Sequence, residues 1–95
     1  KTPYIIVYRQ NNKFALFQSD KRLLGGLWGF AQEEKQPSKS KIIGNVTHHY
    51  SHFALKCEVL LCDSVIQHNR WFSIDEINEL ALSGVDRKVL ALIKR

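Results

Sequence analysis

In the segment from residue 53 to residue 61, large apolar side chains alternate with small or charged ones for three pairs, and this alternation constrains the fold more than any other feature of the sequence. Successive side chains of a β-strand point to opposite faces, so the pattern predicts a strand with one buried face. The side chains expected to point inward are Phe53, Leu55, Cys57 and Val59. Those expected to point outward are Ala54, Lys56 and Glu58. Such a strand needs partner strands and a covering layer.

Several other segments are rich in β-branched and aromatic residues, which predicts further strands. They are residues 4–8, 14–17, 42–47 and 70–72. Residues 30–34 are expected to form a further short strand. Residues 10–13 are polar and predict a turn between the first two strands. Residues 35–41 are polar and basic without an apolar period, which predicts a loop.

Two helix starts follow the last predicted strand. Ser73 and Glu76 have the spacing of a capping box, and Ser83 with Asp86 repeats the start signal. The apolar stripe of the first helix consists of Ile74, Ile77, Leu80 and Ala81. That of the second consists of Val85, Val89, Leu92 and Ile93. Strands followed by helices predict an α+β fold, a mixed or largely antiparallel sheet with C-terminal helices, in one domain over residues 1–95.

The formal charge of +5 is concentrated in the first part of the chain. Residues 1–56 contain nine Lys and Arg against three Asp and Glu, whereas residues 57–95 contain five against six. A basic half suits a polyanion, although an ordinary solvated surface explains it equally well. No apolar run approaches the roughly 20 residues that span a bilayer, so we expect no membrane association. We also expect a monomer. The sequence has no methionine, and we expect it to be a fragment of a longer chain.

Cys57 and Cys62 are the two cysteines of the chain. On a single strand they would lie about 17 Å apart, at about 3.4 Å per residue, and on opposite faces. A disulfide needs Cα atoms within about 7 Å, so the two cysteines are not expected to pair within that strand. We expect core thiols in a reducing, intracellular compartment.

Two short stretches carry the chemistry of the chain. Residues 23–30 combine three glycines with leucines and two aromatic rings, which allows a tight bend beside bulky side chains. After an eighteen-residue gap, residues 49–53 place a hydroxyl and an imidazole beside aromatic rings. A hydroxyl donates and accepts hydrogen bonds, as does a neutral imidazole, and an aromatic ring can stack. This composition suits recognition better than bond cleavage.

The stretches 24–32 and 47–53, in this order and spacing, resemble the C-terminal domain of MutY-type adenine DNA glycosylases. The strand with Trp71 and Phe72 and the closing helix fit as well, so the resemblance covers essentially the whole chain. It implies the Nudix (MutT-like) fold and contact with 8-oxoguanine in duplex DNA. It also implies a separate N-terminal catalytic domain, carrying an iron–sulfur cluster, that excises the opposing adenine. The expected location is the cytoplasm of a bacterium or a eukaryotic nucleus.

The resemblance implies roles for single residues. Ser51 would hydrogen-bond the oxidised base, Tyr50 would wedge or stack beside it, and His52 would support the turn or reach a phosphate, with His49 beside them. Guanine offers only an acceptor at N7, whereas 8-oxoguanine offers a donor there and an acceptor at O8, and one hydroxyl can serve both. Candidate phosphate contacts are Lys21, Arg22, Lys35, Lys39 and Lys41.

The sequence departs from the family pattern in three places. Tyr50 stands where the family usually has phenylalanine, which keeps the ring. Ala31 stands where the family usually has proline, which loosens the turn. Only fifteen residues separate Gln32 from His48, so we expect the helix that carries the Nudix box to be missing or reduced.

Other functions are possible for a chain of this composition. A stand-alone Nudix-type hydrolase of damaged nucleotides would need a glutamate-rich helix to hold magnesium, but Glu33 and Glu34 are the only acids between Asp20 and Glu58. His48 and His52 have a helical zinc spacing in a β-like setting, and we expect no metal and no cofactor in this segment. A module that binds an acidic protein is a third possibility. Trp28, Phe30 and Trp71 are expected in the core rather than as base platforms.

Overall fold

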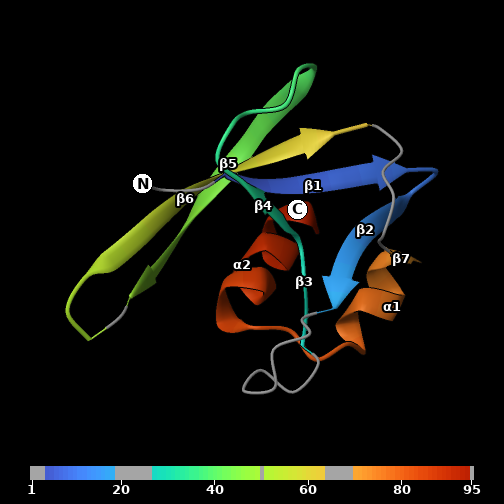
Figure 1. Ribbon diagram of the computed structural model, residues 1–95. Helices are drawn as coiled ribbons and strands as arrows, with labels where there is room; N and C mark the ends of the chain where they lie inside the picture. Colours follow the sequence, from blue (N-terminus) through green and yellow to red (C-terminus); the bar gives the residue numbers. More distant parts are fainter. Residues whose placement is uncertain (1–3, 19–26, 50, 64–69, 95) are drawn as a thin grey trace.

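The computed structural model describes residues 4–18, 27–49, 51–63 and 70–94 (Figure 1). In chain order the elements are β1 (Tyr4–Gln10), β2 (Lys13–Gln18), β3 (Trp28–Gly29), β4 (Ala31–Glu33), β5 (Ser40–His49), β6 (Ala54–Cys62), β7 (Arg70–Phe72), α1 (Ile74–Asn78) and α2 (Gly84–Ile93). Strands therefore precede helices, as the sequence predicts. Among the described residues, no helix is both long enough and apolar enough to cross a membrane.

The strands form one mixed sheet in the order β3-β2-β1-β6-β5, with β4 also paired to β1 and β7 to β2. The β1–β6 pair is parallel, and the other named pairs are antiparallel. The predicted turn between β1 and β2 places Asn11 and Asn12 at φ 52° and 63°. Two successive positive φ values match the twist of a tight hairpin, and asparagine tolerates this conformation better than most residues.

Both helices pack on the same face of the sheet. Ile77 of α1 and Val89 and Leu90 of α2 belong to one buried cluster with inward-facing residues of β1, β2, β5 and β6. Both helix starts are capped as predicted: Ser73 and Glu76 form a complete capping box, and the Ser83 hydroxyl accepts from the Asp86 amide. The first helix ends at Asn78, so the predicted stripe is wrong in placing Leu80 and Ala81 on the helix. Leu80 still packs against the buried cluster, whereas Ala81 is exposed.

The opposite face of the sheet holds a second, smaller buried cluster. Its members are Ile6, Tyr8, Ala15, Leu60 and Cys62. Cys57 is buried in the first cluster and Cys62 in the second, and both are free thiols, which confirms that they lie on opposite faces.

The chain between β4 and β5, residues 34–39, consists of bends and a turn, so the helix expected to be missing or reduced is indeed absent from this connection.

The alternation of β6 is confirmed except at its start. Ala54, Lys56 and Glu58 are exposed as predicted, and Cys57 and Val59 are 4% and 0% exposed. Leu55 is half-buried, and Phe53, which precedes the strand, is 60% exposed. The prediction that Phe53 points inward is therefore wrong, because burial declines from Val59 toward the start of the strand.

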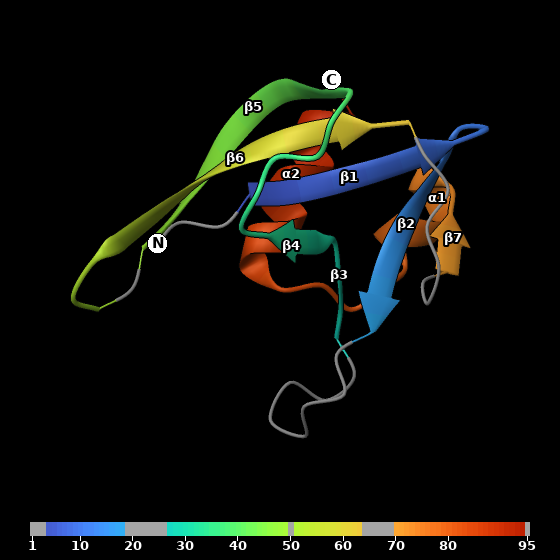
Figure 2. The same ribbon diagram turned by 45° about the horizontal axis from the view of Figure 1, so that its top comes forward.

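The decline in burial follows from the sheet pairing. Residues 59–62 of β6 pair with both β1 and β5, whereas residues 54–58 pair with β5 alone. Residues 45–49 and 54–58 thus form a two-stranded extension, here named the β5–β6 ribbon, which ends at the His49–Ala54 pair. Both views show the ribbon extending away from the other strands (Figures 1 and 2).

Candidate nucleic-acid interface

The turn at the end of the β5–β6 ribbon carries the residues that the sequence predicts to contact the base. Ser51, His52 and Phe53 are all exposed, and residues 51–52 form a bend. His49 is exposed at the last pair of the ribbon, opposite Ala54. Tyr50 lies outside the described residues. The Ser51 hydroxyl is therefore held at an exposed turn, where a large ligand can reach it.

The structure separates the predicted phosphate contacts from this turn. Lys35, Lys39 and Lys41 are exposed, with Lys39 at φ 60° in the turn before β5. Lys41 pairs with Leu61 at the far end of the hairpin, and the eight residues from Lys41 to His49 span about 27 Å at about 3.4 Å each. Lys21 and Arg22 lie outside the described residues. The turn and these described lysines thus occupy opposite ends of β5.

Two other lysines lie nearer the turn. Lys56 is exposed and pairs across the ribbon with Thr47, and the Lys88 ammonium of α2 donates to the Thr47 carbonyl at 2.5 Å. Sequence reasoning placed Lys56 on the outward face without giving it a role. It missed Lys88, because the contact joins residues 41 positions apart. Residues 35–57 contain no Asp or Glu, but the ribbon itself carries Glu58, which is exposed and pairs with Asn45, beside Lys56.

A second feature, on the helix side of the sheet, surrounds Asp86. One oxygen of its carboxylate accepts from the Phe30 amide at 3.2 Å, and the other accepts from the Ser83 hydroxyl at 2.7 Å. Burial raises the pKa of Asp86, and the hydrogen bonds from Ser83 and Phe30 oppose that rise only in part. Gly29 leaves room for the carboxylate, since a Cβ there would stand 2.8 Å from Asp86 Oδ2.

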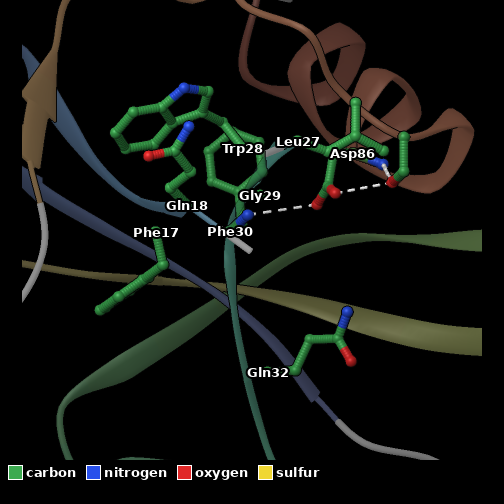
Figure 3. Close-up of a pocket in the computed structure, with 9 residues that line it drawn as sticks. Phe17, Gln18, Leu27, Trp28, Gly29, Phe30, Gln32 and Asp86 are labelled. Carbon is green, nitrogen blue, oxygen red and sulfur yellow. Dashed lines mark hydrogen bonds between the residues drawn. The ribbon is translucent and has the colours of Figure 1, made fainter. Parts of the chain in front are cut away.

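Asp86 also lines a cleft of about 250 Å³. The cleft is bounded by Phe17, Gln18, Leu27, Trp28, Gly29, Phe30, Gln32 and Ser83 (Figure 3). An aromatic wall, two side-chain amides and a carboxylate together can bind a flat ligand that carries hydrogen-bond donors. The sequence signal for Asp86 predicted only a helix start, because the approach of residue 30 to residue 86 is a tertiary contact.

The aromatic residues near this cleft mostly serve packing. Phe30 is buried, and Trp28 and Trp71 are half-buried against the two apolar clusters, which confirms the core interpretation. Trp28 contacts Phe72 edge to face at 5.1 Å between ring centroids. The Arg70 guanidinium lies 5.9 Å from both ring centroids. These contacts tie β3 to β7.

The acids considered for magnesium binding lie in a different setting. Glu33 is on β4 and accepts from the Tyr8 hydroxyl at 2.5 Å. Burial, and after it this hydrogen bond, raises the pKa of Tyr8. Glu34 is exposed in the bend that follows. Within the part of the chain that the structure describes, no three His, Cys, Asp or Glu side chains are grouped to hold a metal ion.

The strands form a mixed sheet, and both C-terminal helices pack on one face of it. A family model for the NUDIX domain matches residues 4–92, and the chain belongs to this family. No curated protein matches the chain at the significance required.

Three solved structures share the fold. The Escherichia coli ORF135 protein has 15% identity and a TM-score of 0.71, covering 98% of this chain and 87% of its own. The C-terminal domain of mouse MUTYH, solved in complex with human PCNA, has 19% identity and a TM-score of 0.70, with coverages of 98% and 86%. The DNA mismatch repair protein MutT, a Nudix hydrolase from methicillin-resistant Staphylococcus aureus, has 14% identity and a TM-score of 0.67, with coverages of 97% and 93%. At these identities the similarity establishes the fold alone.

Proposed function

We propose that this chain is the lesion-recognition domain of an adenine DNA glycosylase, which binds 8-oxoguanine opposite the adenine to be excised. The observation that carries the proposal is the exposed Ser51–His52 turn at the end of the two-stranded β5–β6 ribbon. The fold shared with the C-terminal domain of mouse MUTYH supports it. In this account the segment itself is not an enzyme. Base excision and an iron–sulfur cluster belong to an N-terminal catalytic domain of the parent protein.

The chemistry of recognition follows from the hydrogen-bond pattern of the base. At the groove edge, 8-oxoguanine has a donor at N7 where guanine has an acceptor, and it adds an acceptor at O8. The Ser51 hydroxyl accepts from the first and donates to the second. A base contact of this kind is worth about 1–3 kcal/mol, which corresponds to a preference of roughly 5- to 100-fold. His52 and the lysines near the turn add affinity for phosphate that does not depend on the base.

The test is Ser51→Ala, assayed by titration with duplexes that carry either 8-oxoguanine or guanine opposite adenine. We expect the preference for 8-oxoguanine to fall by about 5- to 100-fold, with affinity for the guanine duplex nearly unchanged. Ser38→Ala is the matched control, because Ser38 is exposed in the loop at the other end of β5. Equal weakening on both duplexes would refute the role of the hydroxyl.

The Asp86 cleft favours a second candidate, a Nudix-type enzyme that hydrolyses damaged nucleotides. A carboxylate with aromatic and amide neighbours in a cleft of about 250 Å³ can receive a nucleobase. Diphosphate hydrolysis additionally requires carboxylates that hold magnesium. The two candidates separate in one assay: magnesium-dependent pyrophosphate release from nucleoside triphosphates supports the hydrolase, and we expect none.

A further inference from the structure

β5 is the outermost strand on its side of the sheet, and its outer edge is open. Within the described residues, β6 is the one strand that pairs with β5 (Figure 2). In an antiparallel pair, the main-chain groups of alternate residues point away from the partner strand. The Lys88 ammonium reaches the Thr47 carbonyl from α2, which indicates that this carbonyl points away from β6. The N–H and C=O of Asn45, two residues earlier, then point the same way.

A groove of about 290 Å³ lies beside this edge. Its lining comes from three consecutive residues of β5 and three residues of α2: Asn45, Val46, Thr47, Lys88, Ala91 and Leu92. Val46 is buried, Leu92 is half-buried and Ala91 is exposed. The groove therefore combines an open strand edge, apolar side chains and one ammonium group.

On its helix side the groove is bordered by positive charge. α2 and the residue directly after it expose three cations: Arg87, Lys88 and Lys94. The one acid of the helix, Asp86, is buried. Glu58 of the ribbon has the same parity as Leu60, so it lies on the face of the sheet that the helices do not cover. The helix side of the groove thus attracts carboxylates.

The hydrogen-bonding groups select a peptide over other partners that charge alone would allow. A phosphodiester has no donor for an outward carbonyl of β5 and no apolar group for the groove. A peptide main chain has both donors and acceptors, and its side chains can be apolar. A second copy that added its own β5 to this edge would bring two cationic α2 helices together on one face, and like charges repel.

We propose that the open edge of β5 binds an extended acidic peptide as an additional strand. An apolar side chain of the peptide enters the groove, a peptide amide takes over the Thr47 carbonyl, and the released Lys88 ammonium pairs with a carboxylate. Strand addition of this kind draws affinity from main-chain hydrogen bonds and specificity from pockets for alternate side chains. Ser51 takes no part in it, so the inference goes beyond the proposed function and assigns a site for a protein partner.

The probe is a fluorescent seven-residue peptide of alternating valine and glutamate, titrated with the chain. Asn45→Pro removes an outward N–H and keeps the ladder with β6, because proline is tolerated where the N–H of an edge strand faces away from its partner. We expect it to weaken peptide binding by roughly 5- to 20-fold. Asn45→Ala is the matched control, since it keeps the N–H and should retain affinity. Thermal unfolding of each variant checks that the fold is kept.

A second pair of variants tests the charge. Lys88→Glu turns attraction for the peptide into repulsion and is expected to weaken binding by roughly 3- to 30-fold. Lys94→Glu makes the same charge change outside the groove, where Lys94 contacts Asn78, and should have a clearly smaller effect. Amide hydrogen exchange locates the peptide: exchange at Asn45 and Thr47 should slow when it binds.

Several outcomes would overturn the inference. One is the absence of peptide binding, and another is binding that leaves exchange at Asn45 and Thr47 unchanged. Equal affinity for a peptide N-methylated at alternate residues would show that no strand is added. If Lys88→Glu weakened binding of duplex DNA but not of the peptide, the groove would be a nucleic-acid contact. If the unaltered chain self-associated and Asn45→Pro abolished this, the occupant would be a second copy.

Discussion

The two halves of β6 continue one alternating pattern but meet different surroundings. Residues 59–62 are flanked by β1 and β5 and lie within both buried clusters, whereas residues 54–58 have β5 as their one strand neighbour and lead to an exposed turn. Side chains of the same parity range from 0% exposed at Val59 to 60% at Phe53. Period-two alternation therefore fixes which face a side chain points to, but the neighbouring layers determine whether that face is buried. The body of the sheet supplies stability, and the ribbon presents the turn.

The largest effect on stability is expected in the body of the sheet. Leu60 is completely buried, so Leu60→Ala removes a packed side chain and should lower the free energy of unfolding by about 2–5 kcal/mol. Leu55 on the ribbon is half-buried, so Leu55→Ala should lower the free energy of unfolding by clearly less than Leu60→Ala does. Urea unfolding of both variants measures the difference. Equal losses would mean that the ribbon is packed as tightly as the body, which would contradict the comparison.

A smaller effect is expected where the two halves meet. Gly44 pairs with Val59 just after a register shift, and its φ of 158° is uncommon for residues with a side chain. A Cβ there would stand 3.0 and 3.1 Å from the two Leu92 methyl carbons, so α2 or the strand must move. We expect Gly44→Ala to lower the free energy of unfolding, measured by urea titration, by about 1–3 kcal/mol.

The control for that substitution is Gly84→Ala. Gly84 is exposed in the first turn of α2, where alanine is a better helix former by up to about 1 kcal/mol. This variant should be neutral or slightly more stable in the same urea titration. If Gly44→Ala were also neutral, the contact between the bend in β5 and α2 would not determine how the ribbon is held.

The smallest expected effect is a pH dependence of the free energy of unfolding, which comes from the buried Asp86. Because burial raises the pKa of Asp86, the folded state binds its proton more tightly than the unfolded state does. The contribution of Asp86 to stability therefore falls as the pH rises from about 4, the ordinary value for a carboxyl group, through the raised pKa. Asp86→Asn still accepts from the Phe30 amide but does not titrate, so its stability relative to the unaltered chain should improve with rising pH.

An exposed carboxylate provides a control of opposite sign. The hydrogen bond from Arg9 lowers the pKa of Asp63, so its contribution is present above the ordinary carboxyl pKa and is lost as the pH falls through the lowered one. Asp63→Asn should therefore lose stability relative to the unaltered chain as the pH rises. Chemical unfolding at a series of pH values measures both trends. Parallel trends in the two variants would contradict the assignment for Asp86.

The sequence predicts those features of the fold that are determined by residues close to one another in the chain. The capping box at Ser73, the turn at Asn11 and Asn12, and the opposite placement of the two cysteines all depend on residues close in sequence. Sequence reasoning failed where the cause is tertiary. Nothing near Phe53 indicates that the covering layer ends before it.

The candidate site likewise has some features that the local sequence predicts and others that depend on tertiary contacts. The exposed turn with Ser51 and His52 was predicted from a motif and lies at the surface, as recognition requires. The Asp86 contacts with Phe30 and the Lys88 contact with Thr47 join segments 56 and 41 residues apart, and no local pattern encodes them. The spacing of Lys35, Lys39 and Lys41 from the turn likewise depends on the length of β5 in the folded hairpin.

The central claim is that the exposed serine in the turn of the β5–β6 ribbon distinguishes an oxidised purine from a normal one. The most direct test is the ratio of dissociation constants of the unaltered chain for two duplexes that differ only in 8-oxoguanine or guanine opposite adenine, at one fixed salt concentration. We expect tighter binding to the oxidised duplex by roughly 5- to 100-fold. Equal dissociation constants for the two duplexes would contradict the account.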